Sequence, residues 1–237
     1  MHHRTAVFLV AGAALAAVLP AAPPTAIADT AAWAVKVARA TVLVEASSRN
    51  ETRTGSGFFL DRPGFVATAL HTVVGARSIR VAIPGRYAAS AARLRAASST
   101  WDLAILEAAW PDAVPCPGLA LDAAQTLPTG AEVAVTGFGL LDGDPSRTAL
   151  TIRGIVSGAI EHRGGVSYVL DLQARQGLSG SPVYRTDTGA VVGLLTRVHA
   201  PAQGWGPGGA APAAAIAELL SGLDAPRDPE PPRAAHP

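Results

Sequence analysis

The sequence contains a single cysteine, Cys116, so no disulfide can form within the chain. Aromatic residues make up only 5% of the 237 residues, whereas hydrophobic residues make up 49%. The core therefore has to be packed from small side chains such as Ala and Val. Cys116 lies between two prolines in VPCPG and has no recognisable base motif beside it, so we do not interpret it as a nucleophile.

An excess of charge of either sign is also absent, because 19 Lys and Arg residues balance 18 Asp and Glu residues. Such a chain has no overall charge with which to attract nucleic acid or an anionic membrane, and nucleic-acid partners are not expected. No His, Cys and Asp cluster has the spacing of metal ligands. We therefore expect no metal and no organic cofactor.

The N-terminus has the three parts of a secretory signal peptide: a basic start, an apolar stretch over about residues 5–19, and the small-residue motif Ala26-Ile27-Ala28. We expect residues 1–28 to be removed by a cut after Ala28. A cut after Ala22 and a retained membrane anchor remain alternatives, although the apolar stretch is shorter than a membrane span. The prediction is a secreted or periplasmic protein without stable membrane insertion after cleavage.

The rest of the chain consists mainly of short β-type runs separated by Gly, Pro and Asp, among them SIRVAI, DLAILEA and AVVGLLTRV. This pattern favours an all-β barrel or sandwich. A proline-rich stretch over 110–130 divides the runs into two halves, because clustered prolines do not fit a central strand. PAAAIAELL, over 212–220, predicts a short terminal helix, and we expect the proline-rich tail over 224–237 to be disordered.

The stretch GLSGSP, over 177–182, places Ser179 in a polar turn between two apolar runs. A serine needs a histidine base, and the base needs a carboxylate to orient it. His71 is a candidate base because it follows the strand-like GFVATAL and opens a predicted helical turn; His162 falls at a predicted hairpin tip, and His199 is the third candidate. Asp102 directly precedes an apolar run, where a buried carboxylate needs a hydrogen-bond donor.

The order His71, Asp102, Ser179 and four motifs resemble the trypsin-like serine peptidases, and most closely their bacterial HtrA/Deg branch. The motifs are GSGFFLDRPGFVATALHTVVGA, WDLAILE, TIRGIVSGAI and GLSGSPVY…GAVVGLLT, within a resemblance that covers about residues 38–220. The resemblance implies a domain over 30–223 made of two six-stranded antiparallel β-barrels, at about 38–110 and 120–205, with a short C-terminal helix. Only 17 residues follow Leu220, so no PDZ domain is expected.

The resemblance also implies a serine endopeptidase that acts on proteins or peptides through an acyl-enzyme. Ser179 would attack, His71 would transfer the proton, and Asp102 would orient His71, while the backbone N–H groups of Gly177 and Ser179 would form the oxyanion hole. The substrate would contact the segment before Ser179 and the following strand, at Gln173, Gln176, Thr196, Arg197 and Val198. Uncharged Gln173 favours small or medium uncharged substrate side chains, whereas Arg175 or Arg197 turned inward would favour an acidic one.

Three positions depart from the family pattern. Leu178 stands where Asn or Asp usually precedes the serine, Ser181 replaces a glycine, and Phe138-Gly139 replaces an asparagine-proline pair. Leu178 rules out activation through an ion pair with a new N-terminal ammonium. Two alternatives therefore stay open: a catalytically silent binding module with a protease fold, and an esterase that uses the same triad. The sequence does not predict the oligomeric state.

Overall fold

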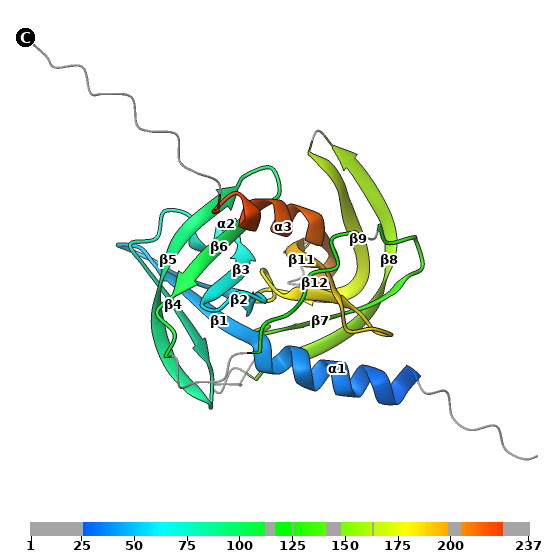
Figure 1. Ribbon diagram of the computed structural model, residues 1–237, viewed down its shortest axis with the longest axis horizontal. Coiled ribbons are helices and arrows are strands. Elements are labelled where there is room, and N and C mark those ends of the chain that lie inside the picture. The colour runs from blue at the N-terminus through cyan, green and yellow to red at the C-terminus, as the bar shows by residue number, and fades with distance from the viewer. Residues whose placement is uncertain are drawn as a thin grey trace, which may run out of the picture.

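The fold is known from a computed structural model that describes residues 26–111, 117–124, 126–140, 148–162, 164–198 and 205–224. Most of the predicted leader, Cys116, His199 and the predicted disordered tail from residue 225 lie outside the described residues. Within them, twelve strands form two closed, six-stranded, antiparallel barrels that lie side by side (Figure 1). The predicted all-β class with two six-stranded barrels is therefore confirmed.

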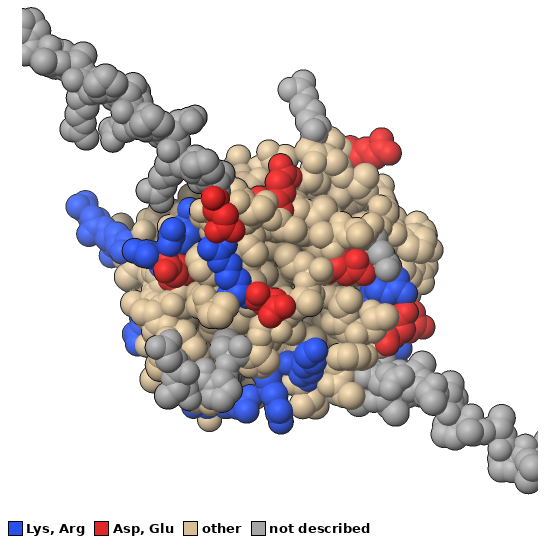
Figure 2. Space-filling view, viewed as in Figure 1, with Lys and Arg blue, Asp and Glu red and all other residues tan. Residues whose placement is uncertain are grey.

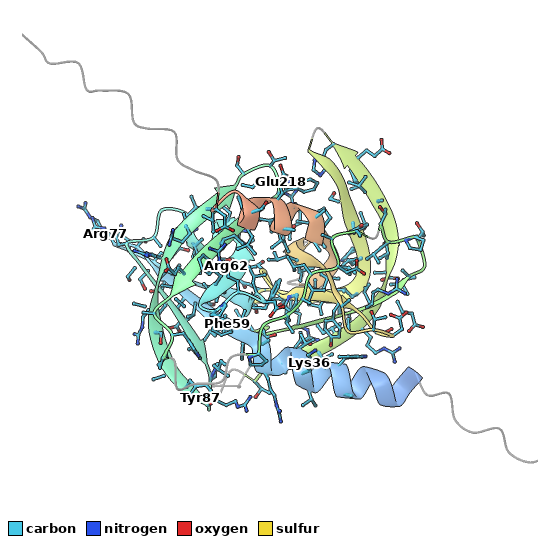
Figure 3. All side chains as sticks on the ribbon, viewed as in Figure 1. Lys36, Phe59, Arg62, Arg77, Tyr87 and Glu218 are labelled. Atoms are coloured by element: carbon cyan, nitrogen blue, oxygen red, sulfur yellow. The ribbon has the colours of Figure 1, made fainter. Side chains whose placement is uncertain are left out.

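The first barrel closes in the strand order β1-β2-β3-β6-β5-β4. Its six strands are β1 (Thr41–Ser47), β2 (Thr52–Phe59), β3 (Phe65–Ala69), β4 (Ser78–Ile83), β5 (Tyr87–Ser98) and β6 (Leu103–Ala108). In β4 the buried residues alternate with more exposed ones, as expected for a strand with one face on a core. Phe59 and Tyr87, labelled in Figure 3, both make edge contacts with the Trp110 ring, at centroid distances of 4.9 and 5.9 Å.

The second barrel closes in the strand order β10-β11-β12-β9-β8-β7. Its six strands are β7 (Glu132–Gly137), β8 (Leu150–His162), β9 (Gly165–Arg175), β10 (Pro182–Arg185), β11 (Val191–Val198) and β12 (Trp205–Pro212). The long β8–β9 hairpin rises beyond the rest of this barrel in Figure 1. It supports the interpretation of His162 as a tip residue, because His162 pairs with Gly165 at the end of the hairpin.

Three helices complete the described fold, and one of them is not predicted by the sequence. This helix, α1 (Ala26–Ala40), runs along the second barrel and leads directly into the first (Figure 1). Its Trp33 packs so closely on the β10–β11 turn that a Cβ on Gly189 would lie 2.3 Å from the indole. Lys36, labelled in Figure 3, places its ammonium 5.1 Å from the centre of the same ring.

The predicted terminal helix is confirmed as α3 (Ala213–Ser221), which packs on strands of both barrels. Its Ile216 is fully buried in the cluster between the barrels, together with Phe58 and Tyr184. An ion pair joins the segment that follows α3 to the first barrel. The guanidinium of Arg62 donates to both carboxylate oxygens of Asp224 at 3.0 and 2.9 Å. Figure 3 shows Arg62 in the region below α3 in that view.

The described surface carries charges of both signs. On the face in Figure 2, acidic and basic side chains are scattered over a larger uncharged area. Among the described residues, no helix combines the length and apolar composition needed to cross a bilayer.

Candidate active site

His71 is placed by the junction between a strand and a single helical turn. Strand β3 ends at Ala69, and α2 (Leu70–Val73) begins at the next residue. The guanidinium of Arg53 donates to the backbone carbonyls of His71 and Val74, so this turn is tied to β2. The imidazole stays 49% exposed, and it can therefore meet a reactant from solvent.

Asp102 holds His71 through both of its carboxylate oxygens. Oδ1 accepts the backbone N–H of His71 at 2.8 Å, and Oδ2 lies 2.6 Å from the ring atom Nδ1. The carbonyl of Asp102 also accepts the N–H of Leu70 at 2.9 Å. Asp102 has a φ of 53°, and among the described residues it is the only one other than glycine with a positive φ. Aspartate tolerates this left-handed conformation better than most residues.

The turn that carries Ser179 packs against the residues around His71. The Ser179 carbonyl accepts the N–H of Ser56 at 2.7 Å. A Cβ on Gly180 would lie 3.0 Å from the backbone nitrogen of Ala69, and a Cβ on Gly55 would lie within 3.0 Å of both the Ser179 carbonyl and Thr72. Ala69 and Thr72 flank His71 in the sequence, so the fold brings the Ser179 turn to the His71–Asp102 pair.

The turn before Ser179 is fixed at two successive carbonyl groups. The Gln176 carbonyl accepts the N–H of Leu140 at 2.9 Å, and the Gly177 carbonyl accepts the Ser56 hydroxyl at 2.8 Å. Because C=O and N–H point in opposite directions across a trans peptide, the first bond turns the Gly177 N–H away from Leu140. Among the described residues, the N–H groups of Gly177 and Ser179 have no hydrogen-bond partner.

Gly177 is required by this geometry. Its φ is +92°, a conformation that side chains disfavour, and a Cβ would lie 2.5 Å from the Phe138 carbonyl. The replacement of the family's asparagine-proline pair by Phe138-Gly139 thus leaves a segment whose main chain contacts the turn directly. The N–H groups on both sides of Gly139 are used, since Phe138 donates to Ser56 and Leu140 donates to Gln176.

Leu178 is an apolar anchor where the family usually has a polar residue. Its side chain is fully buried in the core of the second barrel, with Val133 and Val135. Two glycines at the end of β7 and just after it leave room for this side chain, because a Cβ on Gly137 or Gly139 would lie 3.1 or 3.3 Å from it. The turn is therefore held on the barrel by packing and not by an ion pair.

The predicted substrate-contacting residues lie on β9, on β11 and in the turn after β9. Gln173, Gln176 and Arg197 are exposed, whereas Thr196 is buried and donates its hydroxyl to the Gly209 carbonyl at 3.1 Å. Val198 ends β11, and its side chain is outside the description. Arg175 is half-buried, and within the part of the chain that the structure describes its Nε is a buried donor without a hydrogen-bond partner.

A pocket of about 380 Å³ adjoins Thr196 and Arg197, and its other lining residues include Trp101 and His162. The two rings meet edge to face with centroids 4.6 Å apart, so the β8–β9 hairpin of one barrel contacts the residue before Asp102 in the other. Trp101 is absent from the predicted site residues, although its place beside Asp102 is a signal that could have identified it. The predicted site residues also do not include Ser56 and Arg53, because their contacts arise only in the folded chain.

No group of three or more His, Cys, Asp or Glu residues that could hold a metal ion is found in the described ranges. The imidazole of His71, oriented by Asp102, can accept and return a proton. The N–H groups of Gly177 and Ser179 can donate hydrogen bonds to a negatively charged oxygen.

A family model, the trypsin-like peptidase domain, matches residues 55–194, which is more than half of the chain. No curated protein matches the sequence.

Solved structures of several proteases share this fold. The HtrA-type protease AlgW with a tripeptide matches with a TM-score of 0.70 and 21% identity, over 82% of this chain and 63% of that one. The serine endoprotease from Yersinia pestis matches with a TM-score of 0.67 and 25% identity, over 82% of this chain and 66% of that one. The active form of the Rv3671c protease from M. tuberculosis matches with a TM-score of 0.69 and 20% identity, over 94% of this chain and 97% of that one. This chain thus spans slightly less than two thirds of the first two proteins.

Proposed function

The chain belongs to the trypsin-like peptidase family, and we propose that it is a serine endopeptidase that acts through His71, Asp102 and Ser179. The observation that carries the proposal is the two-point contact between Asp102 and His71, with the Ser179 turn packed against the residues on either side of His71. A serine in an ordinary polar turn has no need of such a pair.

In the proposed mechanism, Ser179 Oγ attacks the carbonyl carbon of a peptide bond while His71 Nε2 takes the hydroxyl proton. Asp102 accepts a hydrogen bond from Nδ1–H without taking the proton, which keeps Nε2 free to act as the base and stabilises the imidazolium that forms. His71 then gives its proton to the leaving amine as the C–N bond breaks, and an acyl-enzyme remains. Water repeats the same steps on the ester, with His71 again as base and then as acid.

The negative oxygen of each tetrahedral intermediate would lie at the N–H groups of Gly177 and Ser179. Both are without other partners in the described structure, and the bond from Leu140 to Gln176 supports the orientation of the first. Loss of one such donor typically costs about 2.7–4 kcal/mol of transition-state stabilisation. The arrangement therefore supports an active turn over the silent binding module.

We propose that the substrate is a peptide or protein segment that lies along Gln173–Gln176 and Thr196–Val198. The structure of AlgW with a tripeptide, which shares the fold, supports a peptide substrate. Exposed Gln173 supports a preference for uncharged side chains at the cleaved residue. Arg175, whose buried Nε finds no partner among the described residues, supports the alternative of an acidic residue. The signal-peptide pattern of residues 1–28 supports action outside the cytoplasm.

The test is cleavage of a peptide library by the mature chain, with Ser179→Ala as the control. We expect the native chain to cut peptide bonds with one dominant residue before the cut, and the control to cut none. Turnover of ester but not peptide substrates would establish the esterase instead. Equal cleavage by both proteins would eliminate Ser179 as the nucleophile.

A further inference from the structure

We propose that Ser56, a buried residue of the first barrel, is a positioning residue for the oxyanion turn of the second barrel. The inference rests on the proposed function, and it concerns how the two donors at Gly177 and Ser179 are held in place. No predicted site residue lies on β2, the strand that carries Ser56.

Ser56 contacts the turn at both of its ends. Its hydroxyl donates to the Gly177 carbonyl at 2.8 Å, and its backbone N–H donates to the Ser179 carbonyl at 2.7 Å. The residue is fully buried. One first-barrel residue thus fixes the peptide groups that follow both of the proposed oxyanion donors.

The same hydroxyl also accepts the N–H of Phe138 at 2.8 Å, so it joins the turn to the segment after β7. Two residues further on, Leu140 donates to the Gln176 carbonyl. Gly177 is therefore held on both sides, by Leu140 through the preceding peptide and by Ser56 through the following one. Because glycine rotates more freely than any other residue, both contacts are needed to define where its N–H points.

Ser56 is itself held by its own strand pair and by tight surroundings. Its carbonyl accepts the Thr68 hydroxyl at 2.7 Å. A Cβ on Gly137 would lie 2.7 Å from the Ser56 hydroxyl, and a Cβ on Gly55 would lie 3.0 Å from the Ser179 carbonyl. The Gly55-Ser56 pair on β2 therefore combines a residue without a side chain, which lets the turn approach, with one small hydroxyl.

Without the Ser56 hydroxyl, the Gly177 carbonyl and the Phe138 N–H would both be buried without partners. Rotation about the backbone bonds of Gly177 is a direct way to relieve such a pair, and it would also shift the preceding peptide, which carries the proposed oxyanion donor. The affinity for the transition state would then fall, whereas ground-state contacts along Gln173 and Thr196 would remain.

The test compares Ser56→Ala with Thr41→Val, which removes another buried hydroxyl that donates to a backbone carbonyl, that of Val37 at the junction of α1 and β1. For Ser56→Ala we expect kcat on a peptide substrate to fall about 10–100-fold, with KM within about twofold. A peptide aldehyde bonds to Ser179 Oγ and places its oxygen at the oxyanion position. Its inhibition constant should therefore rise by about the same factor as kcat falls. Thr41→Val should change none of these values.

Ser56→Cys keeps the shape with a weaker donor, so it should lose less activity than Ser56→Ala, and it carries the test if the alanine variant does not fold. The proposal is overturned if Ser56→Ala matches Thr41→Val in kcat and in aldehyde binding. It is also overturned if kcat falls only in proportion to the loss of folded protein, with no matching change in the aldehyde inhibition constant. These results are distinct from failure of the proposed function, in which the native chain would cleave no more peptide than Ser179→Ala.

Discussion

Asp102 contacts His71 at two atoms: its carboxylate oxygens lie 2.8 Å from the backbone nitrogen and 2.6 Å from the ring atom Nδ1. An aspartate that lay beside a histidine without a structural role would contact only the imidazole ring. The two-point contact sets both the position of the residue and the orientation of the imidazole. It leaves Nε2 as the ring atom available to a reactant.

Asp102→Asn should therefore abolish most activity without unfolding the chain. Asparagine tolerates the φ of 53° as well as aspartate does, but its amide N–H₂ would face Nδ1 and select the wrong imidazole tautomer. We expect kcat to fall by about 10⁴-fold with little change in the melting temperature. Asp102→Ala is the comparison, because it should lose stability as well as activity. A fully active asparagine variant would show that Asp102 does not orient His71.

Gly177→Ala should lower kcat more than the strain of a side chain at a positive φ would by itself. The added Cβ would meet the Phe138 carbonyl at 2.5 Å and force the turn to move. Gly75→Ala is the matched control, since Gly75 also has a positive φ, +72°, but nothing lies within 4 Å of its Cβ position. We expect kcat to fall by about 10²-fold or more for Gly177→Ala and to stay near the native value for Gly75→Ala. Similar activities for the two variants would contradict the assigned role of the turn.

Leu178→Asn should destabilise the fold, even though Asn is common at this position in the family. The substitution removes a fully buried apolar side chain and places an amide in the second-barrel core. We expect the free energy of unfolding to fall by about 2–5 kcal/mol, measured by denaturant titration. Leu94→Asn, at a side chain that is 43% exposed, should cost much less. Equal stability of both variants would show that Leu178 does not anchor the turn.

Stability in acid should depend on Glu107. Hydrogen bonds from Arg93 first, and then from Arg95, hold the pKa of its carboxyl below the ordinary value. A lowered pKa in the folded chain stabilises the fold above the ordinary pKa, and this contribution is lost as the pH falls through the folded value. Between about pH 5 and pH 3, the melting temperature of Glu107→Gln should thus fall less steeply than that of the native chain. Glu51→Gln, at an exposed glutamate, is the control, and parallel curves for the native chain and Glu107→Gln would refute the linkage.

Several strands and the local setting of His71 could be predicted because their signals are local. SIRVAI coincides with β4, and His71 lies in a helical turn that directly follows a strand, although the turn begins at Leu70, one residue before its predicted start. Each of these features depends on a short apolar pattern or on residues next to each other in the chain.

Other features could not be predicted because neighbours from distant parts of the chain decide them. Strand β12 has few residues that favour strands, and it forms because its glycines let β11 and β9 approach; a Cβ on Gly208 would lie 2.7 Å from Leu195. The helix α1 begins within the predicted leader, which ends at residue 28, and its buried Val37 and Ala40 face neighbours that no local pattern marks. The contacts of Ser56 reach 82 and 121 residues along the chain, so no local pattern marks them.

The joint action of His71, Asp102 and Ser179 is tested most directly by fluorophosphonate labelling of the mature chain, with the modified residue located by mass spectrometry. The probe phosphonylates a serine only when a base activates the hydroxyl. We predict one label, on Ser179, and its loss in a folded His71→Ala variant. Labelling of Ser179 that persists without His71, or no labelling of a native chain that cleaves peptides, would contradict the account.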